Sequence, residues 1–277
     1  MLTTRFAPSP TGRLHLGHAY AALFAERSAR RAGGRFLLRI EDIDETRCRP
    51  AFTQAIRDDL PWLGLTWEEP VRVQSAHFDD YRAVLAALAG RGLVYPCFCT
   101  RADIARGSHG QTPDGAPLYP GTCRDLPADL RAARLAEGHP HAFRLDMAKA
   151  LATCPLPLSY VETGESGETG HIPCHPERFG DIVLARKACP TSYHLAVTHD
   201  DARQGVTLVT RGADLRPATD LHRLLQTLMG WPEPAYAHHR LITDDHGAKL
   251  AKTAGSAPLR ALGLAVITHP LAKGANV

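Results

Sequence analysis

Two histidines and a glycine stand immediately before the first helix-like run of the sequence. The segment Arg5–Phe24 reads RFAPSPTGRLHLGHAYAALF, with His15, Gly17 and His18 ahead of an apolar run that begins at Ala19. The first N–H groups of a helix lack intrahelical partners and carry a partial positive charge, so a helix N-terminus attracts phosphate. Imidazoles there add donors, and Gly17 leaves room for a flat ring against the backbone. The spacing predicts an ATP site, although an isolated HxGH also fits a capped surface loop.

A pair of lysines lies near the end of the chain, in the segment KLAKT. Two lysines alone fit a solvated surface loop. Together, however, APSPTGRLHLGH and KLAKT resemble the two signatures of class I aminoacyl-tRNA synthetases, in the form found in the glutamyl and glutaminyl enzymes. Leu16 replaces a frequent isoleucine, and KLAKT departs from the usual KMSKS at three positions. The resemblance implies that charge growing on the phosphoryl oxygens, as pyrophosphate leaves ATP, is stabilised by His15, His18, Lys249 and Lys252.

Three segments of the sequence contain charged and polar residues that could bind a small substrate. RIEDIDETR contributes Glu41, Asp42 and Asp44; SYHLAVTHDD contributes Tyr193 and His194; VTRGADL contributes Arg211. These segments resemble the RIEDTD, YHLAxxxDD and RGxDL segments of glutamyl-tRNA synthetases. A glutamate substrate fits their chemistry, because arginine binds carboxylates in a bidentate manner and an acidic side chain binds an ammonium group.

The resemblance then implies a role for each pocket residue. Arg5 and Arg211 hold carboxylates, Ser9 and Tyr193 hydrogen-bond the substrate, Glu41 meets its amino group, and Ala7 lies in the same loop. Which arginine binds which carboxylate stays open. Each of these residues taken alone fits a surface salt bridge of small energetic value.

Three of the seven cysteines have the spacing of a metal site. CFC supplies Cys97 and Cys99, and LYPGTC supplies Tyr119 and Cys123. Zinc takes four ligands, for which imidazole is a common choice, so His109 is a candidate for the fourth. CxC…YxxxC, however, resembles the zinc site of one small branch of the family, in which tyrosine completes the set, and we expect Tyr119 to do so here. Reduced buried thiols are the alternative.

The elements that must position these residues alternate between strand and helix. Strands are predicted over residues 2–7, 35–42, 93–99 and 205–214, and helices over 19–32, 52–63, 75–93 and 219–229, with Ser75 as an N-cap. The alternating pattern resumes at 178–186. Such alternation predicts an α/β fold with a doubly wound parallel sheet and a ligand at the carboxyl ends of its strands. By resemblance, residues 1–99 and 177–253 form the two halves of a Rossmann-like catalytic domain.

Residues 100–176 are rich in Gly, Pro, His and Asp and lack clear periodicity. We expect them to form an irregular insertion that holds the zinc and contacts the acceptor. After Thr253 only 24 residues remain, a short tail (254–277) that we expect to contain no anticodon-binding domain. No apolar run approaches the ~18 residues of a membrane helix, and no signal-peptide pattern is present, so we expect a cytoplasmic chain. The sequence shows no signal for closed symmetric association, and we expect a monomer. The net charge of +3 gives only a weak indication of an anionic partner.

The short tail and the CxC…YxxxC spacing together resemble the glutamyl-queuosine tRNA(Asp) synthetases. The resemblance implies activation of glutamate with ATP and Mg²⁺ in the absence of tRNA, followed by transfer to queuosine at the wobble position of tRNA(Asp). Phosphates of the anticodon arm would then be bound by Arg101, Arg106, Arg124 and Arg131. Three alternatives stay open: a truncated glutamyl-tRNA synthetase charging tRNA(Glu), a catalytically silent tRNA-binding paralogue, and a small HxGH nucleotidylyltransferase.

Overall fold

Three parallel strands form the N-terminal sheet. The computed structural model describes residues 1–155, 157–242 and 259–261. It places β1 (Thr3–Phe6), β2 (Arg35–Ile40) and β3 (Glu68–Val73) in the order β1-β2-β3. The connections are α1 (Leu16–Arg31) and α2 (Pro50–Trp62). The predicted β-α-β beginning of the chain is therefore confirmed.

The alternation of side chains along β2 gives this sheet two different faces. Phe36, Leu38 and Ile40 pack with buried residues of α1 and α2. Leu37 instead joins the core formed with α3 (Phe78–Gly90), α7 (Tyr193–Arg203) and α8 (Ala218–Met229). Arg39 and the following Glu41 have the same parity as Leu37, so the sequence directs both charged groups toward the α7 side of the sheet.

A second, mostly parallel sheet continues the first. Its order is β7-β6-β10-β9, with β10 (Ala235–His239) parallel to both β6 (Ser159–Glu162) and β9 (Leu208–Gly212). The edge strand β7 (Gly170–Pro173) is antiparallel to β6. The N–H of Thr207 donates to the Thr3 carbonyl at 3.0 Å, so β9 lies beside β1.

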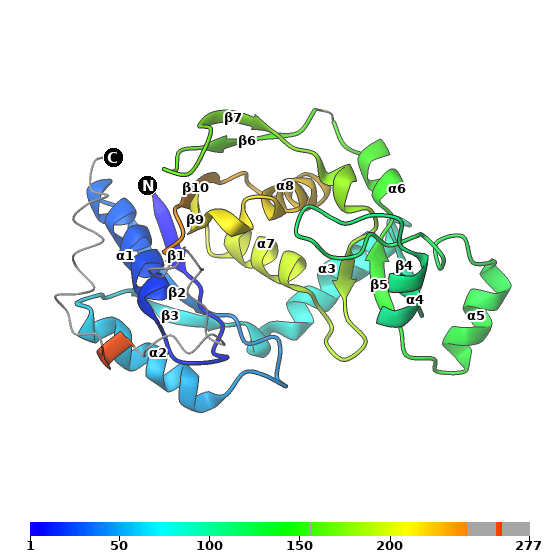
Figure 1. Ribbon diagram of the computed structural model, residues 1–277, viewed down its shortest axis with the longest axis horizontal. Coiled ribbons are helices and arrows are strands. Elements are labelled where there is room, and N and C mark those ends of the chain that lie inside the picture. The colour runs from blue at the N-terminus through cyan, green and yellow to red at the C-terminus, as the bar shows by residue number, and fades with distance from the viewer. Residues whose placement is uncertain (156, 243–258, 262–277) are drawn as a thin grey trace.

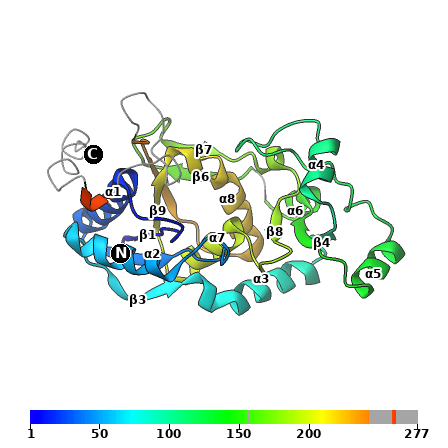
Figure 2. The same cartoon turned by 60° about the horizontal axis from the view of Figure 1, so that its bottom comes forward.

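The strand order therefore reverses at β1, because β2 and β3 lie on one side of it and β9 and β10 on the other. In both views β1 and β9 lie between α1 on one side and α7 and α8 on the other (Figures 1 and 2). This is the doubly wound arrangement that the sequence predicts. Such folds bind ligands outside the carboxyl ends of the strands at the point of reversal.

The third sheet differs from the prediction. β4 (Val94–Cys97), β5 (Ala142–Leu145) and β8 (Val183–Ala185) pair antiparallel in the order β4-β5-β8. The expectation that residues 93–99 and 178–186 continue the parallel pattern is therefore wrong. An apolar run indicates that a strand is buried, but it carries no information about the direction of its partner. This sheet takes one strand from each of the segments 1–99, 100–176 and 177–253.

The segment 100–176 is also more regular than expected. It contains β5, β6 and β7 together with three short helices, α4 (Arg101–Gly107), α5 (Ala128–Ala136) and α6 (Met147–Ala152). Asp181 ties it to the rest of the molecule, because its carboxylate accepts from Tyr95 Oη at 2.5 Å and Arg124 Nη1 at 3.0 Å. Its carbonyl accepts from Arg144 Nη1 at 2.6 Å.

Two helix starts differ from the sequence-based expectations. Helix α1 begins at Leu16, not Ala19, with His15 as its N-cap. Ser75 does not cap α3: it lies in the 3₁₀ turn Gln74–His77, and its hydroxyl and N–H donate to Asp42 at 2.6 and 2.8 Å. The helices predicted over 52–63 and 219–229 agree with α2 and α8 to within two residues. Further 3₁₀ turns span Pro176–Phe179, Ala213–Leu215 and Leu259–Ala261.

Within the described parts of the chain, no helix has the length and apolar character needed to span a membrane.

Candidate active site

A cavity of about 560 Å³ opens at the carboxyl ends of β1 and β9. This volume lies in the range of small-molecule sites. The cavity is lined by all the predicted glutamate and ATP residues that the structure describes: Arg5, Ala7, Ser9, His15, Gly17, His18, Glu41, Tyr193 and Arg211. Lys249 and Lys252 lie outside the described residues. The lining also includes residues that sequence reasoning did not single out, among them Thr210, Gly212, Asp214 and His239.

The two histidines of the HxGH segment cap helix α1 reciprocally. His15 Nδ1 accepts from the N–H of Gly17 at 3.1 Å, and His18 Nδ1 accepts from the N–H of His15 at 3.2 Å. The ring centroids are 3.8 Å apart. Because each Nδ1 accepts, each neutral ring carries its proton on Nε2. The helix N-terminus thus presents imidazole N–H donors in addition to its remaining amides.

Gly17 also leaves room for a ring of the protein itself. A Cβ atom at this position would lie 3.1 Å from His15 Cε1 and 3.3 Å from His15 Nδ1. The missing side chain therefore leaves room for the imidazole of His15, which is folded back onto the helix amide.

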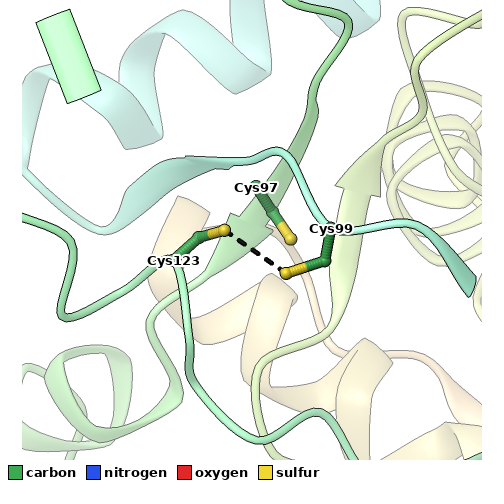
Figure 3. A group of neighbouring side chains, drawn as sticks. All are labelled: Cys97, Cys99 and Cys123. Atoms are coloured by element: carbon green, nitrogen blue, oxygen red, sulfur yellow. Dashed lines mark hydrogen bonds between the residues drawn. The ribbon is translucent and has the colours of Figure 1, made fainter. Parts of the chain in front are cut away.

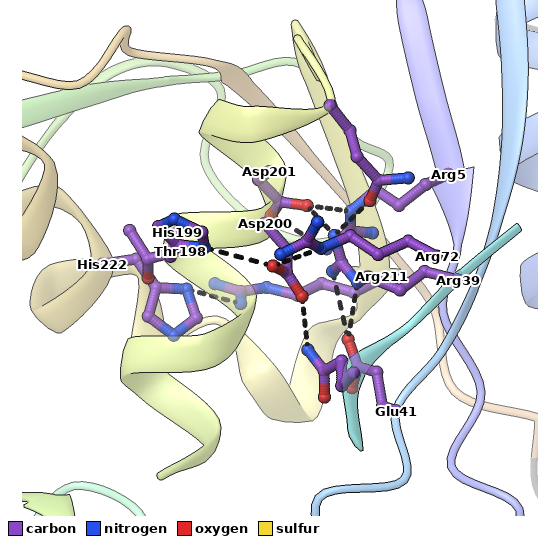
Figure 4. A network of polar contacts seen from close by, with 12 residues as sticks. Arg5, Arg39, Glu41, Arg72, Thr198, His199, Asp200, Asp201, Arg211 and His222 are labelled. Carbon is purple, nitrogen blue, oxygen red and sulfur yellow. Dashed lines mark hydrogen bonds and ion pairs between the residues drawn. The ribbon is translucent and has the colours of Figure 1, made fainter. Parts of the chain in front are cut away.

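Arg5, Arg39 and Glu41 form a buried ion network around Asp201 on α7 (Figure 4). Asp201 accepts from Arg5 Nε at 2.8 Å and from Arg39 Nη1 at 2.7 Å. Arg39 Nη2 donates to Glu41 Oε1 at 3.0 Å. Burial opposes ionisation of Asp201, but Arg5 and Arg39 outweigh it and lower the pKa of that carboxyl. A buried carboxylate thus holds Arg5 at the cavity wall, and Arg39 holds Glu41.

The neighbouring Asp200 belongs to a second network, which does not line the cavity. It accepts from Arg72 Nε at 2.7 Å, Gln74 Nε2 at 2.9 Å and Tyr81 Oη at 2.8 Å. Burial would raise the pKa of Asp200, but the bond with the adjacent His199 and the charges of Arg39 and Arg72 lower it to about 2. Asp200 therefore joins α7 to β3 and α3.

Arg211 is held at the end of β9 by uncharged acceptors. Its Nε donates to His238 Nε2 at 3.1 Å, its Nη1 to His222 Nδ1 at 3.0 Å, and its Nη2 to Thr219 Oγ1 at 2.6 Å. His238 in turn contacts the Glu162 carboxylate through Nδ1. The sequence analysis missed these partners. The parity of the segment AYAHH directs Tyr236 and His238 to one face of β10, but the sequence analysis did not assign a strand there.

The other candidate residues lie outside the cavity lining. Asp42 binds Ser75, and Asp44 accepts from Thr46 Oγ1 at 2.6 Å and Arg47 Nε at 2.7 Å. The Thr46 bond is the main cause that lowers the pKa of Asp44 to about 2. Both carboxylates therefore shape the loop after β2. His194 Nδ1 lies 3.3 Å from His222 Nε2, behind Arg211.

The cysteines of CFC and LYPGTC come together at the end of β4 (Figure 3). The sulfurs of Cys97, Cys99 and Cys123 lie within 4.8 Å of one another, and Cys99 Sγ is 3.4 Å from Cys123 Sγ. Tyr119 Oη is 3.4 Å from Cys97 Sγ and 3.8 Å from Cys99 Sγ. His109 is exposed, and no described histidine belongs to the group. The arrangement could hold a metal ion.

Comparison with known proteins assigns the family. The model of the tRNA synthetases class I (E and Q) catalytic domain matches residues 1–258. The chain belongs to this family. The resemblance stated from the HxGH, RIED and RGAD segments is thereby confirmed, as is the expectation of a ligase-type enzyme.

Individual class I synthetases resemble the chain to different extents. A Rhodobacter capsulatus protein named Glutamyl-Q tRNA(Asp) synthetase is 49% identical over 261 residues, covering 91% of each chain. Glutamate–tRNA ligase of Aquifex aeolicus is 38% identical over 259 residues, covering 93% of this chain and 53% of that protein. The crystal structure of a glutamate-tRNA synthetase from Elizabethkingia anophelis superposes with a TM-score of 0.71 at 30% identity. The superposition covers 91% of this chain and about half, 52%, of that synthetase.

Proposed function

We propose that this chain activates L-glutamate with ATP, without tRNA, and transfers the glutamyl group to the queuosine base at the wobble position of tRNA(Asp). One observation carries the proposal: Arg5, Glu41, Tyr193 and Arg211 share a single cavity with His15 and His18. Two arginines and one carboxylate match the two carboxylates and the ammonium of glutamate, and the capped N-terminus of α1 offers donors to phosphate.

In the first step the glutamate α-carboxylate attacks the α-phosphorus of ATP in line. A carboxylate O–P bond forms, the bond from that phosphorus to the bridging oxygen breaks, and pyrophosphate leaves with the electron pair. His15, His18, Lys249 and Lys252 stabilise charge on the phosphoryl oxygens, with Mg²⁺ accompanying ATP. No activated nucleophile of the protein is required, so we assign no covalent enzyme intermediate.

The cysteine cluster is proposed as a structural zinc site with Cys97, Cys99, Tyr119 and Cys123 as ligands. Tetrahedral zinc with Zn–S of about 2.3 Å and Zn–O of about 2.0 Å sets ligand atoms about 3.5–3.8 Å apart. The distances from Tyr119 Oη to two sulfurs, 3.4 and 3.8 Å, fit these values. Burial opposes ionisation of Cys123, but the N–H of Phe98 lowers the pKa of that thiol. Zinc would join β4 to the loop that contains Tyr119.

The identity of the RNA that accepts the glutamyl group is a separate part of the proposal. The Rhodobacter capsulatus relative named Glutamyl-Q tRNA(Asp) synthetase is matched over 91% of its length, which favours the queuosine-bearing anticodon arm. We also propose that the enzyme is cytoplasmic and monomeric. A conventional glutamyl-tRNA synthetase charging tRNA(Glu) is the second candidate. The 38% identity to a glutamate–tRNA ligase supports it.

Amino-acid activation is tested by ATP–pyrophosphate exchange without tRNA, with glutamate, glutamine or aspartate. We expect exchange with glutamate alone. Glutamine would leave an arginine of the pocket without its counter-charge, at a cost of several kcal/mol, and aspartate is one methylene too short to reach both arginines. Absence of exchange would favour a silent tRNA-binding paralogue, and equal exchange with glutamine would contradict the pocket assignment.

Transfer is tested with radiolabelled glutamate and four RNAs: tRNA(Asp) with and without queuosine, a queuosine-bearing anticodon stem-loop, and tRNA(Glu). We expect labelling of the queuosine-bearing tRNA(Asp) and of the stem-loop only. Charging of tRNA(Glu) at its terminal adenosine, with no labelling of the stem-loop, would favour the conventional synthetase instead.

A further inference from the structure

The arginines at the cavity differ in how their charge is balanced. Arg5 and Arg39 both donate to the buried carboxylate of Asp201. Among the residues that the structure describes, no carboxylate pairs with Arg211; its three hydrogen bonds go to His222, His238 and Thr219. Arg211 is buried, and a buried guanidinium without a counter-charge is costly. Such an arrangement persists where a ligand supplies the missing anion.

The hydrogen-bond directions require both imidazoles to be neutral. A guanidinium can only donate, so His222 Nδ1 must accept and the proton of that ring lies on Nε2, which faces His194 Nδ1 at 3.3 Å. His238 accepts through Nε2, so its proton lies on Nδ1 and is donated to Glu162. An imidazolium at either position would place two donors against each other.

Burial and the nearby Arg211 favour the same protonation state. Burial, followed by the charge of Arg211, holds the pKa of His222 well below its usual range. Burial lowers the pKa of His194 to about 4. Burial also lowers the pKa of His238, although the bond to Glu162 opposes it. The imidazoles therefore orient Arg211 without neutralising it.

Glu162 is separated from Arg211 by the imidazole ring of His238. Its carboxylate accepts from Nδ1 of His238 and from the N–H groups of His238 and Gly164, at 3.0 and 2.8 Å. It thereby fixes the ring orientation and tautomer of His238. The network reaches this carboxylate only across the imidazole, so Glu162 does not pair with the guanidinium directly.

We propose that His222 and His238 are positioning residues that determine substrate specificity: they hold Arg211 with uncharged acceptors, so that its positive charge remains available for a carboxylate of the substrate. The proposal rests on glutamate being the substrate. The proposal explains why glutamate is preferred over glutamine. The residues that hold Arg211 are uncharged, so its full positive charge favours a carboxylate, and no additional contact to the substrate is needed.

A matched pair of substitutions isolates charge from shape. In His222→Asn the amide oxygen takes the place of Nδ1 as a neutral acceptor, whereas His222→Asp has the same shape and adds a carboxylate beside Arg211. We expect His222→Asp to raise the glutamate KM about 10²-fold above that of His222→Asn, the scale on which altering a buried charge pair weakens binding. The glutamate-to-glutamine ratio of kcat/KM should fall at least about 10-fold, and the KM for ATP should change little.

Circular dichroism and melting temperature show whether His222→Asp folds. If it does not, a second pair, Thr219→Asn and Thr219→Asp, makes the same comparison at another nitrogen of Arg211. His171→Asn replaces an exposed histidine of β7 and is the control for effects of substitution and purification that do not involve Arg211. Equal glutamate KM and equal selectivity within both pairs would overturn the proposal. Failure of the wild-type protein to show glutamate-dependent exchange would instead overturn the proposed function, so the two failures are distinguishable.

Discussion

Two adjacent aspartates on α7 have separate tasks. Asp201 binds Arg5 and Arg39 at the cavity wall, whereas Asp200 binds Arg72 and side chains of the 3₁₀ turn and α3. Neighbouring residues on a helix point about 100° apart, so one turn of α7 serves both networks. The charge of the pocket is thus set by Asp201, and the placement of α7 by Asp200.

This division predicts different effects of the same chemical change. Asp201→Asn weakens the bonds that hold Arg5 at the cavity wall and Arg39 against Glu41. We expect the glutamate KM to rise at least about 10-fold, because small displacements of groups that position a substrate are costly. Asp200→Asn should lower the melting temperature and leave the glutamate KM within about threefold. ATP–pyrophosphate exchange and thermal unfolding measure the two effects. Similar KM values for both variants would refute the assignment.

At this scale the sequence indicated the residues that line the cavity better than those that hold them in place. Arg5, Glu41, Tyr193 and Arg211 belong to segments with a family pattern, and all line the cavity. His222 and His238 were missed because their contact with Arg211 depends on which faces of α8 and β10 turn toward β9. Spacing along the chain does not contain that information.

At the scale of elements, the parallel sheets follow from local patterns and the antiparallel sheet does not. Apolar runs between helix signals predicted β1, β2 and β9, and the doubly wound order follows from that alternation. The pairing of β4 with β5 spans the whole of α4 and α5, so no local signal specifies it. The bonds to Asp181 and the cysteine cluster are among the contacts that join distant segments in this part of the fold.

Elemental analysis of freshly purified, reduced protein should find one zinc ion per chain. Tyr119→Phe should weaken zinc binding at least about 10-fold, the scale for losing even an outer-shell partner of a metal site. His109→Ala is the matched control and should retain the ion, because His109 is exposed and outside the cluster. If the tyrosine variant keeps its zinc and the histidine variant loses it, the choice of fourth ligand is wrong.

At the scale of the whole molecule, the third sheet and its helices lie on the far side of α7 and α8 from α1 (Figure 2). Three of the four arginines that we predict to bind RNA also have protein partners. Arg106 pairs with Asp103, Arg124 with Asp181, and Arg131 Nη2 donates to the Leu126 carbonyl at 3.1 Å. Arg101 begins α4 and is exposed. It is therefore the best-placed of the four to contact a phosphate.

Salt dependence tests this assignment. A single phosphate contact contributes about 0.7–0.9 to the slope of log K against log salt concentration, so Arg101→Ala should reduce the slope for the anticodon stem-loop by about that amount. Arg82→Ala, which removes an exposed arginine of α3 that pairs with Asp79, is the control and should leave the slope unchanged. Fluorescence anisotropy across a salt series provides the constants. An unchanged slope for Arg101→Ala would remove this residue from the interface.

The cavity at the reversal of strand order has consequences for inhibitor chemistry. Residues of β1 and α1 line it together with residues at the end of β9, and the hydrogen bonds between Thr207 and Thr3 lie at the opposite ends of these strands. Under the proposed function, a hydrolysis-resistant mimic of the acyl adenylate would bind as a bivalent ligand, with one group in each part of the cavity. The spacer between the two groups, rather than the affinity of either group alone, would then control potency through effective concentration.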